Sequence, residues 1–200
     1  MNWNNTPIDE IREIIRIEND PKLAIKKIIE VCRNKIPSSI WAEFEGMKIE
    51  QDILDAEKWL KESFDEFPEF KGIYFGLDTL NMGSGNGSNI EIGLSKSCDP
   101  KILSDEWTFN CEFYGKNHLI KGLHEISSSF LEKNKWNSEV RAVAEYVIFL
   151  GYSGIILRDS IKKLNISTDY LSIWGFHDGD MFFLSQRRGG ICGVITNVDL

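Results

Sequence analysis

Residues that cross-link a chain or interrupt its regular structure are few in this sequence. Its 200 residues include four cysteines and five prolines. No C-x-x-C pair occurs and no histidine stands near a cysteine in the sequence, so the spacing of a zinc site is absent. We expect reduced thiols that pack as small hydrophobic groups in a cytoplasmic protein. The four are Cys32, Cys98, Cys111 and Cys192.

Signals for export and for membrane insertion are also missing. Residues 1–7 contain neither the basic stretch nor the apolar run of a signal peptide. The longest uncharged apolar run, residues 146–157, is well short of the about 20 residues that a membrane-spanning helix needs. We therefore expect a cytoplasmic protein without a membrane partner, and a buried core helix over this run.

Positive charge is not concentrated anywhere in the chain, whereas negative charge is. The formal net charge is −8, and residues 43–71 carry ten carboxylates against four lysines. Because no basic stripe stands out, nucleic-acid binding through phosphate neutralisation is disfavoured. The acidic segment has two interpretations: a contact surface for a basic protein partner, or the solvated face of an ordinary helix.

The hydrophobic pattern predicts helices first and a sheet afterwards. Apolar residues make up 42% of the chain and aromatic residues 12%, which is sufficient for a large core. Helical spacing of apolar residues predicts helices over residues 7–19, 21–37, 49–64, 119–132 and 138–164. Short apolar segments, which alternate with polar residues in 89–95 and 106–114, predict strands over 72–77, 89–95, 106–114, 171–177, 180–186 and 191–196.

These elements define the expected fold class. We predict a single α+β domain over residues 1–200, in which residues 1–66 are mainly helical and residues 70–200 form a sheet with a central helix. The sheet should be mostly antiparallel, with five to six strands and helices packed on it. Gly151 and Gly154 lower the helix propensity of the central helix, so we expect them where another element approaches closely. The predicted core contains Trp107, Phe109, Val147, Ile148, Ile155, Ile161, Ile173 and Phe176.

Two loops could carry chemistry, and each has a simpler interpretation. The glycine-rich loop Gly83–Ser88 leads into a strand instead of a helix and lacks the lysine of a phosphate-binding loop, so a hairpin loop is favoured. His177, Asp178 and Asp180 could hold a divalent metal ion. However, Asp178-Gly179 is also the residue pair of a type I′ hairpin turn.

Other catalytic patterns are not found. The remaining histidines, His118 and His124, are six residues apart and would lie on different faces of one predicted helix. No nucleophile motif of the Gly-x-Ser-x-Gly type occurs. We therefore assign no catalytic residue and no cofactor from the sequence.

Several short segments between residues 70 and 186 are similar to those of a group of bacterial proteins. They are Gly72-Ile-Tyr-Phe-Gly-Leu77, Glu145-Tyr146, Leu150-Gly-Tyr152, Leu157-Arg-Asp159 and Gly175-Phe-His-Asp-Gly-Asp180. In these segments the chain resembles small bacterial proteins related to the immunity proteins of toxin systems. The resemblance implies a non-enzymatic binding role in which an acidic surface contacts a basic toxin. It identifies no functional residues.

Two functions follow from these observations. The first is a protein-binding module, such as an immunity or inhibitor protein, whose contact residues would be Glu50, Asp55, Glu57 and Glu62. The alternative is a small-molecule enzyme or ligand-binding protein with a site near the Gly83–Ser88 loop and the Asp178-Gly179 hairpin. The alternative site would include His177, Asp178 and Asp180. The oligomeric state is not determined by the sequence.

Overall fold

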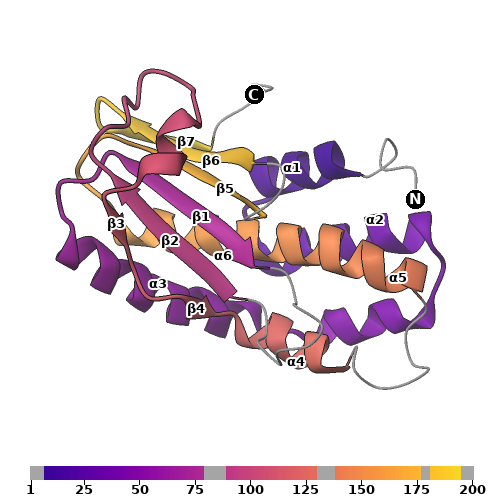
Figure 1. Cartoon of the computed structure of the whole chain (residues 1–200). Coiled ribbons are helices and arrows are strands. Elements are labelled where there is room, and N and C mark those ends of the chain that lie inside the picture. Colours follow the sequence, from indigo (N-terminus) through magenta and orange to yellow (C-terminus); the bar gives the residue numbers. More distant parts are fainter. Residues whose placement is uncertain (1–6, 79–88, 130–137, 177–180, 195–200) are drawn as a thin grey trace.

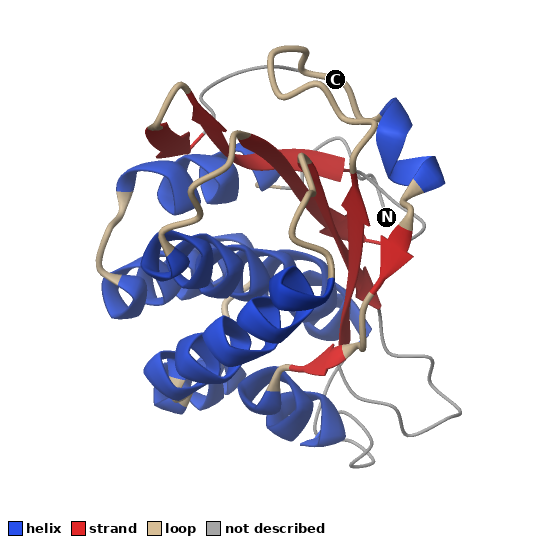
Figure 2. Ribbon diagram, turned by 90° about the vertical axis from the view of Figure 1, so that its left-hand side faces the viewer, coloured by secondary structure: helices blue, strands red, loops and turns tan. Residues whose placement is uncertain are grey.

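Helices cover one face of a mixed, mostly antiparallel sheet (Figures 1 and 2). The computed structural model describes residues 7–78, 89–129, 138–176 and 181–194. The α+β class and the helical N-terminal region predicted from the sequence are confirmed. In the described ranges, no helix combines the length and apolar character needed to cross a membrane.

The first part of the chain is helical, as its apolar periodicity predicted. It contains α1 (Ile8–Ile17), α2 (Pro21–Lys35), the 3-10 segment η2 (Ser39–Gly46) and α3 (Ile49–Glu66). Asp20 caps α2, because its carboxylate accepts hydrogen bonds from the backbone N–H groups of Lys22, at 2.9 Å, and Leu23, at 3.3 Å. The predicted apolar stripe of α3 is buried throughout: Ile49, Ile53, Ala56, Leu60 and Phe64.

The sheet has the strand order β3-β2-β1-β5-β6-β7. Its strands are β1 (Gly72–Asp78), β2 (Asn89–Ser95), β5 (Tyr170–Phe176), β6 (Met181–Arg188) and β7 (Ile191–Val194), with two short segments, β3 (Phe113–Tyr114) and β4 (His118–Leu119). Both short segments pair with β2, so together they act as one broken edge strand. β1 and β5 pair in parallel, and the other described pairings are antiparallel.

The turn between β6 and β7 follows from its two glycines. Gly189 and Gly190 have φ angles of 59° and 85°. A two-residue hairpin turn with positive φ at both positions matches the twist of the flanking strands, and glycine adopts these angles without strain. This turn joins the two strands that were predicted over residues 180–186 and 191–196.

The predicted central helix runs through the middle of the molecule (Figure 1). It consists of α5 (Ser138–Val143), a π-helical turn η4 (Ala144–Ile148) and α6 (Phe149–Leu164). Residues 149–158 of α6 are buried on every side of the helix. α6 contacts α1, α2 and α3 as well as β5 and β6, so it joins the helical layer to the sheet.

The strand predicted over residues 106–114 is wrong. Residues Glu106–Asn110 form a 3-10 turn, η3, and only Phe113–Tyr114 are in a strand. The turn is closed locally, because the indole N–H of Trp107 donates to the Ser104 carbonyl at 2.7 Å and the Thr108 N–H donates to the Asp105 carbonyl at 2.8 Å. As a result Phe109 is 81% exposed, although we predicted it to be buried.

The rest of the predicted core is confirmed. Trp107, Val147, Ile148, Ile155, Ile161, Ile173 and Phe176 are all buried. Trp107 packs against the sheet face opposite the helices, with Tyr74, Cys98, Leu171, Ile173 and Phe183. The prediction of a single domain over residues 1–200 stays a prediction.

Candidate functional site

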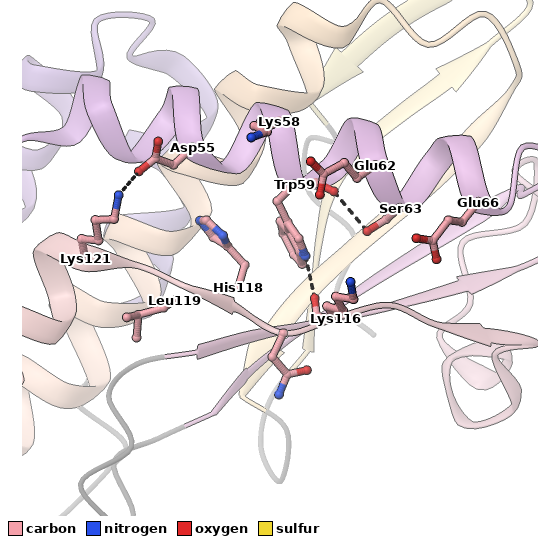
Figure 3. A pocket seen from close by; sticks show the side chains of 11 residues that line it. Asp55, Lys58, Trp59, Glu62, Ser63, Glu66, Lys116, His118, Leu119 and Lys121 are labelled. Carbon is pink, nitrogen blue, oxygen red and sulfur yellow. Dashed lines mark hydrogen bonds and ion pairs between the residues drawn. The ribbon is translucent and has the colours of Figure 1, made fainter.

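A groove of about 440 Å³ lies between α3 and the segment that joins β3 to the next helix, α4 (Lys121–Ser129) (Figure 3). Most of its lining side chains carry a charge or a polar group. They are Asp55, Lys58, Glu62, Ser63 and Glu66 of α3 together with Lys116, Asn117, His118 and Lys121, and the apolar members are Trp59 and Leu119.

The groove follows from the helical spacing of α3. Successive residues of an α-helix are about 100° apart, so Asp55, Glu62 and Glu66 fall within a stripe about 40° wide. Trp59 lies next to this stripe at the border of the buried face, and it is 8% exposed. The acidic stripe therefore forms one wall of the groove, and the indole of Trp59 forms its floor.

The opposite wall is held in place by Trp59. Its indole N–H donates to the Lys116 carbonyl at 2.6 Å, across 57 residues of sequence. Gly115 donates its backbone N–H to the Ile92 carbonyl of β2 at 3.0 Å. These two bonds fix the β3–β4 connection at the sheet edge and at a constant distance from α3.

His118 lies on β4 and stacks on the floor of the groove. Its ring centroid is 4.9 Å from that of Trp59, and the two ring planes differ by 18°. Burial lowers the pKa of His118; the nearby Asp55 raises it and Lys121 lowers it. The helix predicted from residue 119 begins at Lys121, so the expectation that His118 shares a helix with His124 is wrong.

One end of the groove is closed by an ion pair. The ammonium of Lys121 donates to the carboxylate of Asp55 at 2.6 Å, and the Gln51 amide donates to the other oxygen at 3.0 Å. The hydrogen bond from Lys121 is the main cause that lowers the pKa of Asp55. Asp55 is therefore already neutralised within the chain.

The other end contains two carboxylates without a partner. Glu62 and Glu66 make no hydrogen bond or ion pair with the residues that the structure describes. They are one turn apart at the C-terminal end of α3, whose last turn has no basic residue. Like charges at this spacing repel each other, and negative charge near a helix C-terminus is unfavourable. Both effects make exposed negative charge at this end of α3 unfavourable.

Two lysines of the groove also lack a partner in the described ranges, Lys58 on α3 and Lys116 on the opposite wall. Figure 3 shows the Lys116 side chain extending toward α3, between the Trp59 ring and Glu66. The groove therefore contains carboxylates on α3 and an internal cation, Lys116, that faces them.

The structure separates the four predicted contact residues into two groups. Asp55 and Glu62 lie together in the groove. Glu50 and Glu57 lie at least about 120° away around the helix. Glu50 pairs with Lys22 of α2 at 2.5 Å, and Glu57 lies 3.9 Å from Lys163 of α6.

Sequence reasoning did not identify Glu66, Trp59, His118 and Lys116 as site residues. The position of Trp59 beside the apolar stripe of α3 was a usable signal, because an aromatic residue at the border of a buried face is accessible from one side. No local signal places His118 or Lys116 beside it, since they reach α3 only through the sheet edge.

The alternative site lies outside the described residues. This applies to the Gly83–Ser88 loop and to His177, Asp178 and Asp180, so their predicted role stays a prediction. In the ranges that the structure does describe, no group of three or more His, Cys, Asp and Glu side chains could hold a metal ion.

Comparisons with known proteins add no relative. No protein-family model, no curated protein and no solved structure matches the chain.

Proposed function

We propose that this chain is a non-enzymatic protein-binding module that captures a basic partner at the groove beside α3. The observation that supports this most is the pair Glu62 and Glu66 at the unfavourable end of the helix, which make no ion pair with any residue in the described ranges. The short segments that resemble bacterial immunity proteins favour an immunity or inhibitor protein acting in the cytoplasm. In that role the partner would be a basic toxin.

A cationic side chain from a partner would reduce both unfavourable electrostatic effects at this site. It would screen the repulsion between Glu62 and Glu66, and it would place positive charge at the C-terminus of α3. Arginine suits this arrangement better than lysine, because its planar guanidinium can donate to two carboxylates at once.

The lysines of the groove oppose this binding. The Lys116 side chain extends toward α3 (Figure 3), so a partner's cation that binds Glu62 and Glu66 would meet its ammonium. An incoming cation must therefore displace it. This competition keeps the groove from binding any cation strongly, and it predicts that removal of the Lys116 charge increases affinity for a basic partner.

The charge of the whole chain should act mainly on the rate of association. A net charge of −8 attracts a basic partner over several ångströms, which speeds encounter and makes it dependent on salt. Short-range contacts in the groove should instead determine how slowly the complex dissociates.

The proposal is tested with two matched double variants of α3. The first, Glu62→Gln with Glu66→Gln, changes the groove. The second, Glu50→Gln with Glu57→Gln, removes the same charge from the same helix outside the groove. The partner, purified from the native host, is measured with each variant by surface plasmon resonance.

We expect the groove variant to weaken binding by roughly tenfold or more, from the loss of two charged hydrogen-bond acceptors. The control variant changes the net charge by the same two units as the groove variant. It should alter the association rate and its salt dependence only slightly. Lys116→Gln should bind more tightly than the wild type. Equal affinities of the two double variants would contradict the proposal and favour the solvated-face interpretation.

A further inference from the structure

His118 is the titratable group at the centre of the groove. It stacks on Trp59 at 4.9 Å, and the groups around it come from three elements. α3 contributes Asp55 and Lys58, and the start of α4 contributes Lys121. Lys116 and Asn117 precede it in its own segment, and Ile90 of β2 is opposite it in the sheet.

We infer that His118 controls how strongly the groove binds a cation: the neutral imidazole permits binding of a basic side chain, and the protonated imidazolium weakens it. The inference rests on the proposed function, because it concerns the occupant of the same groove. It assigns to His118 a role in specificity that no sequence pattern indicated.

The surrounding charges compensate a proton on His118 only in part. Asp55 is the carboxylate that raises the pKa of His118, but it is already bonded to Lys121 and Gln51. Protonation would leave three positive groups, Lys116, His118 and Lys121, on the wall facing α3. The floor of the groove would then repel the cation that Glu62 and Glu66 attract.

Burial of the ring also disfavours the protonated imidazolium. Because the ring is partly removed from water, the neutral form is favoured and the pKa of His118 lies below its ordinary value. The groove therefore binds cations more strongly at neutral pH than after acidification. By linkage, a bound cation must lower the pKa of His118 further.

The size of the effect follows from one added charge. A unit charge about 8 Å from a bound guanidinium, in a partly hydrated groove of effective dielectric constant about 40, weakens binding by roughly fivefold. Screening by salt reduces this value, so the measurement belongs at low ionic strength.

The experiment uses a defined probe in place of the unidentified partner. The probe is an acetylated and amidated hexapeptide of alternating arginine and glycine, with a second peptide in which citrulline replaces arginine as the neutral control. NMR first gives the pKa of His118 from its ring proton. Peptide affinity is then measured from the indole N–H signal of Trp59, one pH unit below and one above that pKa.

For the full-length wild type we expect roughly fivefold weaker arginine-peptide binding at the lower pH. In His118→Gln the affinity should be equal at both pH values, whereas His124→Gln should behave like the wild type. Saturation with arginine peptide should lower the pKa of His118, a result that does not depend on a variant. The citrulline peptide should not bind.

The outcomes separate the two proposals. An absence of arginine-peptide binding at both pH values would overturn the proposed function. Binding that is independent of pH, or a pKa of His118 that does not fall when the peptide binds, would overturn the inference alone. The same pH dependence in His118→Gln and wild type would overturn it as well.

Discussion

Asp52 is a carboxylate buried among three helices. It is 3% exposed, and its Oδ2 accepts hydrogen bonds from the Tyr152 hydroxyl at 2.9 Å and from the Gly122 N–H at 3.0 Å. The second bond satisfies a free N–H at the start of α4, so Asp52 caps a helix other than its own. It also holds α4, and with it one end of the groove, against α3.

The protonation of Asp52 links folding to pH. Burial raises its pKa, although the bonds from Tyr152 and Gly122 act in the opposite direction. The folded state therefore holds this proton more strongly than the unfolded state. The stability that follows is fully present below the unfolded value, near 3.8, and is lost as the pH rises through the folded pKa.

Asp52→Asn should remove this part of the pH dependence. The amide oxygen can still accept from Gly122 and Tyr152, while the buried charge is gone. We expect urea unfolding of the variant to show a smaller fall in stability than the wild type as the pH rises from 4 to 7. Asp52→Ala, which leaves both donors unsatisfied, should cost about 1–3 kcal/mol at every pH. An unchanged pH profile in Asp52→Asn would show that another group is responsible.

Arg158 is a second buried charge with a structural role. It is 1% exposed, and its guanidinium donates to the carbonyls of Ile15 and Glu18 at the end of α1 and to the carboxylate of Asp159. The negative end of the α1 dipole and Asp159 thus offset the desolvation of this cation. Arg158 fixes the end of α1 against α6.

At the scale of the element, α6 depends on two glycines where its neighbours come closest. A Cβ at Gly151 would lie 2.6 Å from Cδ1 of Ile28, and one at Gly154 would lie 2.7 Å from Cδ1 of Ile15 and 3.0 Å from the indole nitrogen of Trp174. Both isoleucines are buried. Glycine lowers the helix propensity of α6 at these two positions, but its missing side chain lets α1, α2 and β5 pack closely against the helix.

Gly154→Ala should destabilise the protein, whereas its effect on an isolated helix would be a gain of about 1 kcal/mol. We expect a net loss of about 1–3 kcal/mol in urea unfolding, because the methyl group overpacks the contact with Ile15 and Trp174. Ile15→Val removes only Cδ1, the atom nearest the new methyl group. The double variant should therefore lose less stability than the sum of the two single variants.

A matched control is Gly46→Ala, at a position where a Cβ would meet no atom within 4 Å. It should leave stability unchanged or raise it by about 0.4–1 kcal/mol. If Gly154→Ala proved as stable as Gly46→Ala, close packing would not be the reason for glycine in α6.

At the scale of the whole molecule, the sheet has a core on each face. Ile73 and Phe75 of β1 face the helical layer, and Tyr74 between them faces the opposite cluster, because side chains alternate along a strand. Each core contains a buried thiol: Cys32 on the helical side and Cys98 on the other. Burial raises the pKa of both thiols to about 12.

These two thiols test whether the chain unfolds as one domain. Both should resist alkylation in the native protein, since they are buried and protonated. In a single cooperative domain, pulsed alkylation across a urea series should expose Cys32 and Cys98 at the same midpoint, as read by peptide mass spectrometry. Two separate midpoints would divide the chain into independent units. Fully denatured protein without reductant should take up four alkyl groups.

Much of the fold could be derived from local pattern. Several elements depend on residues a few positions apart: the apolar stripe of α3, the cap at Asp20, the turn at Gly189-Gly190 and the alternation in β2. Backbone geometry fixes where such neighbours point, so the sequence by itself determined these elements. The same reasoning failed at Phe109, because a 3-10 turn and a strand can share a short alternating pattern.

Only the tertiary structure decided which acids form a site. Glu50, Asp55, Glu57 and Glu62 are alike in the sequence, yet three of them have partners in the chain, from α2, α4 and α6. The groove exists because a hydrogen bond joins Trp59 to a carbonyl 57 residues away, which brings His118 onto the indole. Contacts of this kind depend on how the sheet edge and α3 are packed together, and no local pattern of residues specifies that distance.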